Sequence, residues 1–239
     1  MLFDKKSRYI GKQFGSYTIS ALIGQGRYGI CFLALSETGQ TVVIKKFKPS
    51  MFKKNAAKNE HEAVILSQLS DGRIPDLLGV INDKNFYGFV LEFKPSFTVK
   101  EMLFKQFYVF SAEEIFNIGL KLIEIIKYLH ANGVVHRDIR TPNVLIDQNE
   151  VYLVDFGLAR WSNSDQYPYD LDFSYLGDFL LYLLYSSFET TKNNKNLPWF
   201  EELDLTLEQK SFLKKLLGLK RTYATIEAIE IEFIRLFKI

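Results

Sequence analysis

A stretch of eight residues, from His136 to Asn143, brings together a carboxylate, a cation and an amide. Asp138 can accept a proton, Arg140 can neutralise an anion, and Asn143 can offer an amide oxygen to a hard metal ion. Asp155 opens an Asp-Phe-Gly triplet twelve residues after Asn143, and each of the two stands beside a short apolar, strand-like run. We therefore expect Asn143 and Asp155 to lie side by side, as oxygen ligands for a Mg²⁺ ion that carries a phosphorylated cofactor.

A glycine cluster near the N-terminus could bind phosphate. Gly24, Gly26 and Gly29 lie between two apolar runs of β-forming residues, which predicts a hairpin. Glycines let the backbone close over a phosphate chain and offer it N–H groups. A strand follows them, whereas the glycines of a dinucleotide-binding fold open a helix. Lys45 ends the next apolar run; taken alone, it could equally be an edge-strand lysine.

The periodicity of the chain predicts the elements that position these residues. A helical pattern covers 56–69, with Val64, Ile65, Leu66 and Leu69 on its buried side. Strand-like runs follow as far as Phe93, and a boundary is expected at 94–96. Two Ser/Thr-x-x-Glu/Gln capping boxes, at 111–114 and 206–209, predict a helix that ends at Gly133 and another over 207–217. A last helix is expected over 225–237.

Composition describes an ordinary folded protein, with 47% hydrophobic and 24% charged residues among 239. One cysteine excludes an internal disulfide and fits a reducing compartment. The N-terminus lacks the apolar core of a signal peptide, and the most apolar segment, 173–188, is interrupted by Asp178. We expect a cytoplasmic protein with no membrane segment. Residues 1–60 carry 11 Lys and Arg against 3 Asp and Glu, which we interpret as a solvated basic face beside a phosphate site, with no nucleic acid expected.

Together these motifs resemble those of the eukaryotic-type (Hanks-type) serine/threonine protein kinases, in identity and in spacing. The resemblance, to a minimal and bacterial kind of member, implies an α+β, bilobal fold. Residues 1–93 would form a β-rich N-lobe and residues 94–239 a mainly helical C-lobe. It also implies ATP with Mg²⁺, or alternatively Mn²⁺, and transfer of the γ-phosphoryl group to a protein hydroxyl.

The resemblance also implies roles for single residues. Asp138 would orient and deprotonate the acceptor hydroxyl, with Arg140 near the transferred phosphoryl group, and Asn143 and Asp155 would hold the metal. Lys45 would bind the α- and β-phosphates and be fixed by Glu62, for which Glu60 is the nearby alternative. The implied nucleotide site comprises Gly24, Gly26, Gly29, Cys31, Val43, Lys45, Leu91, Glu92, Phe93, Lys94 and Leu145. Asp172 would brace the backbone of the catalytic loop.

The segment after Asp155 departs from the family pattern. Only 16 residues separate Asp155 from Asp172, and no Ala-Pro-Glu motif occurs among them. We expect this short segment to be ordered by its own aromatic residues and by Pro168. Asp165 or Asp170 could then pair with Arg137, so that activity would not require phosphorylation of the segment.

Two other functions stay open at this point. A kinase-fold enzyme that phosphorylates a small molecule would explain the missing peptide-docking segment. A nucleotide-binding pseudokinase is the other alternative. Arg140 stands where serine/threonine kinases usually carry lysine, so the choice between Ser/Thr and Tyr acceptors also stays open.

Overall fold

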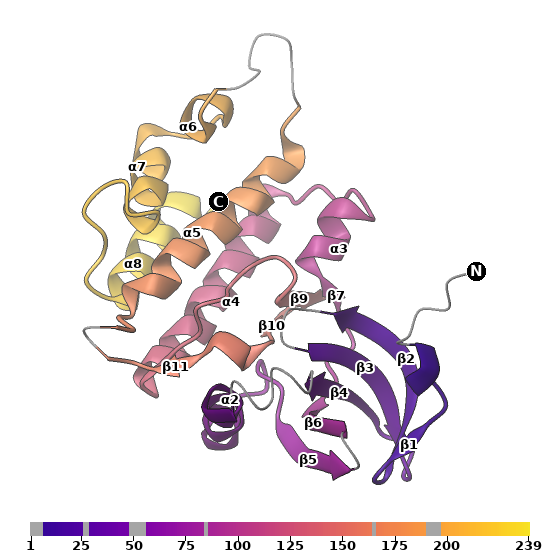
Figure 1. Ribbon diagram of the computed structural model, residues 1–239. Coiled ribbons are helices and arrows are strands. Elements are labelled where there is room, and N and C mark those ends of the chain that lie inside the picture. The colour runs from indigo at the N-terminus through magenta and orange to yellow at the C-terminus, as the bar shows by residue number, and fades with distance from the viewer. Residues whose placement is uncertain (1–6, 26–28, 48–55, 84–85, 164–165, 190–196) are drawn as a thin grey trace. The chain divides into compact units, whose positions relative to one another are not determined.

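The computed structural model describes residues 7–25, 29–47, 56–83, 86–163, 166–189 and 197–239. The chain divides into two compact units, residues 1–94 and residues 95–239, which are described separately. The first unit is β-rich and the second is mainly helical, so the predicted α+β class is confirmed (Figure 1).

The first unit is built on a six-stranded antiparallel sheet with the strand order β1-β2-β3-β4-β6-β5. Its elements are η1 (Ser7–Tyr9), β1 (Gln13–Phe14), β2 (Tyr17–Gln25), β3 (Gly29–Ser36), β4 (Thr41–Phe47), α2 (Ala56–Gln68), β5 (Leu77–Asp83) and β6 (Phe86–Glu92). Strands β2 and β3 pair antiparallel, with Gly24 near the end of β2 and Gly29 at the start of β3, as the flanking apolar runs predict.

Strand register gives this sheet two different faces. Phe32, Ile44 and Val90 belong to one buried apolar cluster. The residues beside them in the chain point to the opposite face, because side chains alternate along a strand. Cys31 pairs with Lys45 across β3 and β4, and Val43 pairs with Leu91 across β4 and β6. These four residues of the predicted nucleotide site therefore share the face that the cluster does not fill.

Helix α2 corrects one detail of the predicted core. Ile65 and Leu66 are buried, with 0% and 3% of their surfaces exposed, whereas Val64 is 44% exposed. Successive residues on a helix are about 100° apart, so three in a row cannot all face the same side. The buried side of α2 instead follows Glu62, Ile65 and Leu66, and Leu69, directly after the helix, is buried as well.

The second unit is organised around the long helix α4. Its helices are α3 (Val99–Phe104), α4 (Ala112–Ala131), α5 (Asp170–Leu184), α6 (Trp199–Glu202), α7 (Leu207–Leu216) and α8 (Ile226–Phe237), with short turns η2 (Phe156–Leu158) and η3 (Tyr185–Ser187). Strands β7 (Phe97–Thr98), β9 (Val144–Asp147) and β10 (Glu150–Leu153) form one sheet, and β8 (Val134–Val135) pairs with β11 (Arg160–Trp161). Helix α4 contacts α5, α8, β8 and β10, and Figure 1 shows α4, α5, α7 and α8 gathered as a bundle.

Both predicted capping boxes are present. Ser111 accepts a hydrogen bond from the backbone N–H of Glu114, whose side chain accepts one from the backbone N–H of Ser111. Thr206 and Gln209 make the same reciprocal pair at the start of α7. Gly133 follows α4 with a φ of 72°, a left-handed conformation that glycine adopts without strain.

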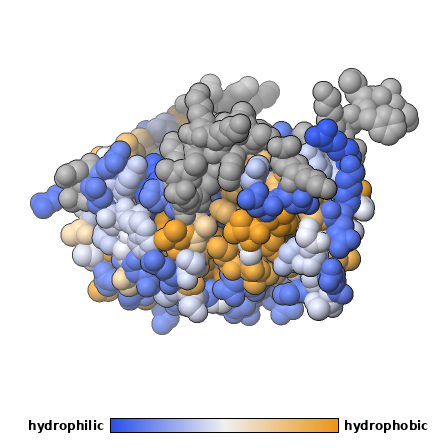
Figure 2. Space-filling view, turned by 60° about the horizontal axis from the view of Figure 1, so that its bottom comes forward, coloured by the Kyte–Doolittle hydropathy of each residue, from blue (hydrophilic) through white to orange (hydrophobic). Residues whose placement is uncertain are grey.

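Some apolar residues remain on the surface. On the face shown in Figure 2, hydrophobic side chains gather in a patch bordered by hydrophilic ones. Large exposed apolar side chains of the second unit include Phe97, Phe104 and Phe107. Within the described residues, no helix combines the length and the apolar character needed to cross a membrane.

Candidate active site

In the first unit, Lys45 and Glu62 form a buried ion pair. The Lys45 Nζ atom lies 2.6 and 2.8 Å from the two carboxylate oxygens of Glu62, and the side chains are only 9% and 2% exposed. Such a pair loses much hydration, so it is weak support for stability and better support for a positioned charge. The two residues come from β4 and α2, as predicted; the Glu60 side chain lies outside the described residues.

The glycine hairpin is shaped by close backbone contact. Gly29 pairs with Phe47, and a Cβ atom at Gly29 would stand 2.4 Å from the Lys46 carbonyl oxygen. Only glycine fits this position without a shift of the backbone. Gly24 pairs with Cys31 at the end of β2. Gly26, also expected at the phosphates, lies outside the described residues.

The segment predicted to hold adenine closes the first unit. Leu91 is buried on β6, and the Glu92 N–H donates to the Asp76 carbonyl at 2.9 Å. The buried Lys94 side chain donates to Glu92 Oε1 at 2.7 Å and to the Gly72 carbonyl at 2.8 Å. The Lys94 ammonium therefore anchors this segment within the first unit, and the Glu92 N–H is already engaged with Asp76. In the second unit, Leu145 lies buried on β9.

In the second unit, Asp138, Arg140 and Asn143 form one hydrogen-bonded cluster. Arg140 Nε lies 2.9 Å from Asp138 Oδ1, and Asn143 Nδ2 donates to Asp138 Oδ2 at 2.7 Å and to the Asp138 carbonyl at 2.9 Å. Asp138 is 9% exposed, while the Arg140 side chain is 58% exposed. Burial raises the pKa of Asp138, and Arg140 and Asn143 act against that rise. Arg140 and Asn143 thus hold one carboxylate oxygen each, which orients the group. Its raised pKa makes it a stronger base than an ordinary aspartate.

Asp172 holds the catalytic loop from the start of α5. Its side chain is fully buried and accepts from the backbone N–H groups of His136 at 2.9 Å and of Arg137 at 2.7 Å. His130 Nε2 lies 3.1 Å from the same carboxylate. Arg137 has a φ of 67°, which is uncommon for a residue with a side chain. The bonds to Asp172 keep the loop in this conformation, as the expected brace requires.

The strand pairing brings Asn143 and Asp155 into neighbouring positions. Strands β9 and β10 are antiparallel, and beyond their last pair the Val154 N–H donates to the Asn143 carbonyl at 2.9 Å. Asp155 follows directly, is exposed, and has a left-handed φ of 64°. The Asn143 amide nitrogen donates hydrogen bonds to Asp138, while the Asn143 Oδ1 atom accepts no hydrogen bond from the described residues. An amide oxygen and a carboxylate at neighbouring positions fit Mg²⁺, whose other ligands are commonly water and phosphate oxygens.

His136 supports the loop from within. Its ring is fully buried, contacts Phe156 edge-on at 4.7 Å between ring centroids, and accepts from the Asp138 N–H at 3.3 Å. Burial lowers the pKa of His136, so the imidazole is neutral at physiological pH. A neutral, enclosed ring suits a structural role.

The prediction that Arg137 pairs with Asp165 or Asp170 is wrong for Asp170. Among the described residues Arg137 makes no ion pair with Asp170, and Asp165 lies outside them. The guanidinium carbon instead lies 4.5 Å from the centre of the Tyr167 ring, and Nη1 donates to the Leu158 carbonyl at 3.1 Å. The contact between Tyr167 and Arg137 is not predicted by the sequence. The only signal for it in the sequence is the aromatic content of the short segment.

Comparison with known proteins identifies a related family. A family model described as "Protein kinase domain" matches residues 17–218. The chain is 33% identical over 233 residues to "Probable serine/threonine-protein kinase YbdM" of Bacillus subtilis, covering 93% of this chain and 90% of the relative. It is 34% identical to "Protein kinase STUNTED" of Arabidopsis thaliana over 70% of this chain, and 30% identical to human "Mitogen-activated protein kinase 13" over 64%. It spans only 28% and 44% of the lengths of those two relatives.

Proposed function

The chain belongs to the protein kinase family and is an ATP-dependent serine/threonine-protein kinase. From this premise we propose how its own residues transfer the γ-phosphoryl group of ATP to a protein hydroxyl. ATP and Mg²⁺ are the substrate and metal typical of the family. The proposal rests above all on the Asp138 carboxylate, which Arg140 and Asn143 orient within a loop that Asp172 braces.

Asp138 orients the hydroxyl of the protein substrate and accepts its proton. The raised pKa of Asp138 improves its strength as a base, since general-base catalysis gains as the pKa approaches the working pH. Arg140 is mostly exposed, so its guanidinium can also meet a phosphoryl oxygen while Nε stays on Asp138.

The remaining residues bind the nucleotide. Lys45, fixed by Glu62, neutralises the α- and β-phosphates, and the glycine hairpin offers them backbone N–H groups. Asn143 and Asp155 would hold Mg²⁺, and Mn²⁺ is a possible substitute because it prefers the same oxygen ligands. When bound, Mg²⁺·ATP supplies the phosphoryl group and neutralises the charge that develops on it. Within the first unit, Cys31, Val43 and Leu91 would provide apolar surface for the base.

We test the proposal with Asp138→Asn. The change keeps the shape of the side chain but removes its ability to accept the proton, and we expect phosphoryl transfer to fall by about 10²–10⁴-fold. ATP binding should stay nearly intact. The measurement is the transfer of labelled γ-phosphate to a generic Ser/Thr-containing protein. Asp147→Asn, an exposed carboxylate at the end of β9, is the matched control.

The location of the label separates the possible outcomes. Label on serine or threonine of the protein, lost in Asp138→Asn, supports the proposal. A variant that retains more than about a tenth of wild-type turnover would show that Asp138 is not the base. Label only in a small molecule, or ATP binding without any transfer, would support one of the two alternative functions.

The single cysteine supports a cytoplasmic location, which is also part of this proposal.

A further inference from the structure

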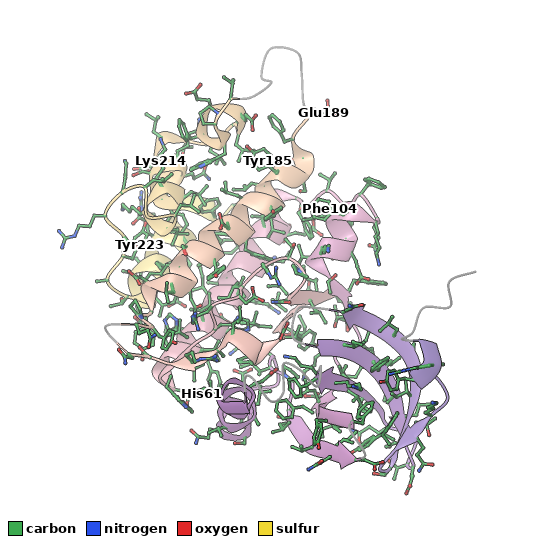
Figure 3. The ribbon with its side chains drawn as sticks, viewed as in Figure 1. His61, Phe104, Tyr185, Glu189, Lys214 and Tyr223 are labelled. Atoms are coloured by element: carbon green, nitrogen blue, oxygen red, sulfur yellow. The ribbon has the colours of Figure 1, made fainter. Side chains whose placement is uncertain are left out.

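The second unit contains an apolar pocket that the proposed catalysis does not use. It has a volume of about 540 Å³, within the range of about 300–1,000 Å³ that is usual for ligand sites. Its walls come from α3, from the segment between α3 and α4, from the C-terminal half of α5 with η3, and from α6. Six of its residues are aromatic: Phe104, Phe107, Tyr108, Tyr182, Tyr185 and Trp199. Figure 3 labels Phe104 on α3 and Tyr185, the first residue of η3 directly after α5.

Phe107 has no role in the core that would explain its conformation. It has a φ of 52°, in the left-handed region that disfavours residues with side chains, and it is 81% exposed. A strained backbone that displays an aromatic ring to solvent is typical of a functional position. Phe104 is also 57% exposed. The pocket therefore continues into an apolar rim, which suits a polypeptide better than a small enclosed ligand.

One carboxylate lines this aromatic pocket. Asp178 is exposed to solvent there, and it has no hydrogen bond or ion pair among the described residues. The apolar groups around it raise the pKa of Asp178 through burial, although the side chain still reaches water. A carboxylate in these surroundings is best compensated by a positive charge.

Two further carboxylates accept hydrogen bonds from tyrosines of this pocket. The hydroxyl groups of Tyr108 and Tyr185 donate to Glu114 and Glu202. The bond to Glu114 raises the pKa of Tyr108, and burial together with Glu202 raises that of Tyr185, so both rings stay neutral. The carboxylates at the hydroxyl ends of these rings add negative potential to that of the electron-rich ring faces, and this potential favours a cation.

We propose that this pocket is a docking site for the protein substrate, and that it binds an arginine or lysine side chain flanked by apolar residues. The cation would lie against the aromatic rings and pair with Asp178, while the apolar neighbours cover Phe104 and Phe107. This inference rests on the protein kinase activity, because it assigns the pocket to the second substrate of that reaction.

Two helices connect the pocket to the catalytic loop. At the start of α3, the Lys100 N–H donates to the Thr141 carbonyl at 2.9 Å, and at the start of α5 Asp172 binds the loop backbone. On α3, Phe104 follows Lys100 by four residues, roughly 6 Å at about 1.5 Å per residue. On α5, Asp178 and Tyr182 follow Asp172 by six and ten residues, which places them roughly 9–15 Å along the helix from the loop. An extended chain covers that distance in about three to five residues. The docked basic residue should therefore lie about that far from the acceptor serine or threonine.

The direct test is equilibrium binding, which does not depend on turnover. A mixture of synthetic peptides with one fixed serine and random flanking residues is applied to the immobilised Asp138→Asn chain, and retained peptides are sequenced by mass. We expect enrichment of Arg or Lys beside apolar residues. A second change, Asp178→Asn, should weaken the binding of the retained peptides by about tenfold. Asp204→Asn, a matched exposed carboxylate outside the pocket, should leave the enrichment unchanged.

Phe107→Gly provides an independent variant. Glycine accepts the left-handed backbone, so the melting temperature should not fall, whereas peptide binding should weaken because the ring is gone. Equal enrichment with and without Asp178, or no preference for basic residues, would overturn the docking site. Asp178-dependent binding of benzyltrimethylammonium without retention of basic peptides would also overturn it, and would assign the pocket to a free organic cation.

The same peptides with the active chain and labelled ATP distinguish this inference from the proposed function. Phosphoryl transfer to serine at a rate that does not depend on the basic residue would contradict only the docking site. Basic peptides that are retained but never phosphorylated, by a chain that also fails on whole proteins, would contradict the proposed function and leave the docking site standing.

Discussion

At the scale of single residues, the environment of Asp138 balances two opposing effects. Burial raises its pKa, which strengthens the base, while Arg140 lowers the pKa and keeps the carboxylate ionised. Only the ionised form can accept a proton, so activity should fall on the acid side as the pH drops through this pKa.

The first prediction follows from that balance. Arg140→Gln removes the positive charge, so the pKa of Asp138 should rise further and the acid limb of kcat/KM should move to higher pH. Initial rates between about pH 5 and pH 9 measure the shift. Arg235→Gln, which removes an exposed arginine far along the chain on α8, should leave the limb in place. An unmoved limb in Arg140→Gln would contradict the coupling.

The second prediction concerns Asp172. Its carboxylate accepts two backbone N–H groups while fully buried, and asparagine can offer them only one oxygen. Asp172→Asn should lower the free energy of unfolding by about 2–3 kcal/mol and reduce turnover, because the loop loses its brace. Urea unfolding measures the loss. Asp178→Asn, on the same helix but exposed, should change stability by no more than about 0.5 kcal/mol.

At the scale of elements, the short segment after Asp155 is held by its own chain. Strand β11 pairs with β8, the Ser162 N–H donates to the Gly133 carbonyl at 2.7 Å, and Asn163 and Tyr167 exchange two backbone hydrogen bonds. The Tyr167 ring then covers Arg137. In related enzymes a phosphate on a longer segment can form an ion pair with the arginine at this position. Here an aromatic ring takes the place of an added charge.

The third prediction tests this substitute. Tyr167→Phe keeps the ring and should retain full turnover from the first cycle, in protein shown by mass to be unphosphorylated. Tyr167→Leu loses the cation–π contact, worth about 0.5–1 kcal/mol at an exposed site, and should show lower turnover and faster proteolysis within 156–169. A lag in wild type that disappears on phosphorylation, or an inactive Tyr167→Phe, would mean that modification is required.

At the scale of the whole molecule, bound nucleotide should stabilise the native state. Mg²⁺·ATP at a hundred times its Kd would add about 2.7 kcal/mol, which corresponds to roughly 5–10 °C in Tm for a chain of this size. The fourth prediction is that this shift occurs in wild type and in Asp138→Asn, and is lost with EDTA or in Asp155→Ala. A full shift in Asp155→Ala would exclude Asp155 as a metal ligand.

Much of this protein could be predicted from its sequence. Capping boxes, glycine turns and apolar periodicity depend on residues within a few positions of one another, and they predicted the helices and strands closely. The motifs of the active site were also readable, because Asp138, Arg140 and Asn143 are near neighbours in one loop. Lys45 and Glu62 required the family resemblance, since 17 positions separate them.

Tertiary structure decided the rest. Which of Val64, Ile65 and Leu66 faces inward depends on how α2 packs, and the partner of Arg137 depends on where a residue 30 positions later places its ring. The docking pocket collects side chains from 103 to 199, and no local pattern predicts that α3, α5 and α6 converge there. Local propensities act over a few residues, whereas these contacts depend on packing between segments far apart in the chain.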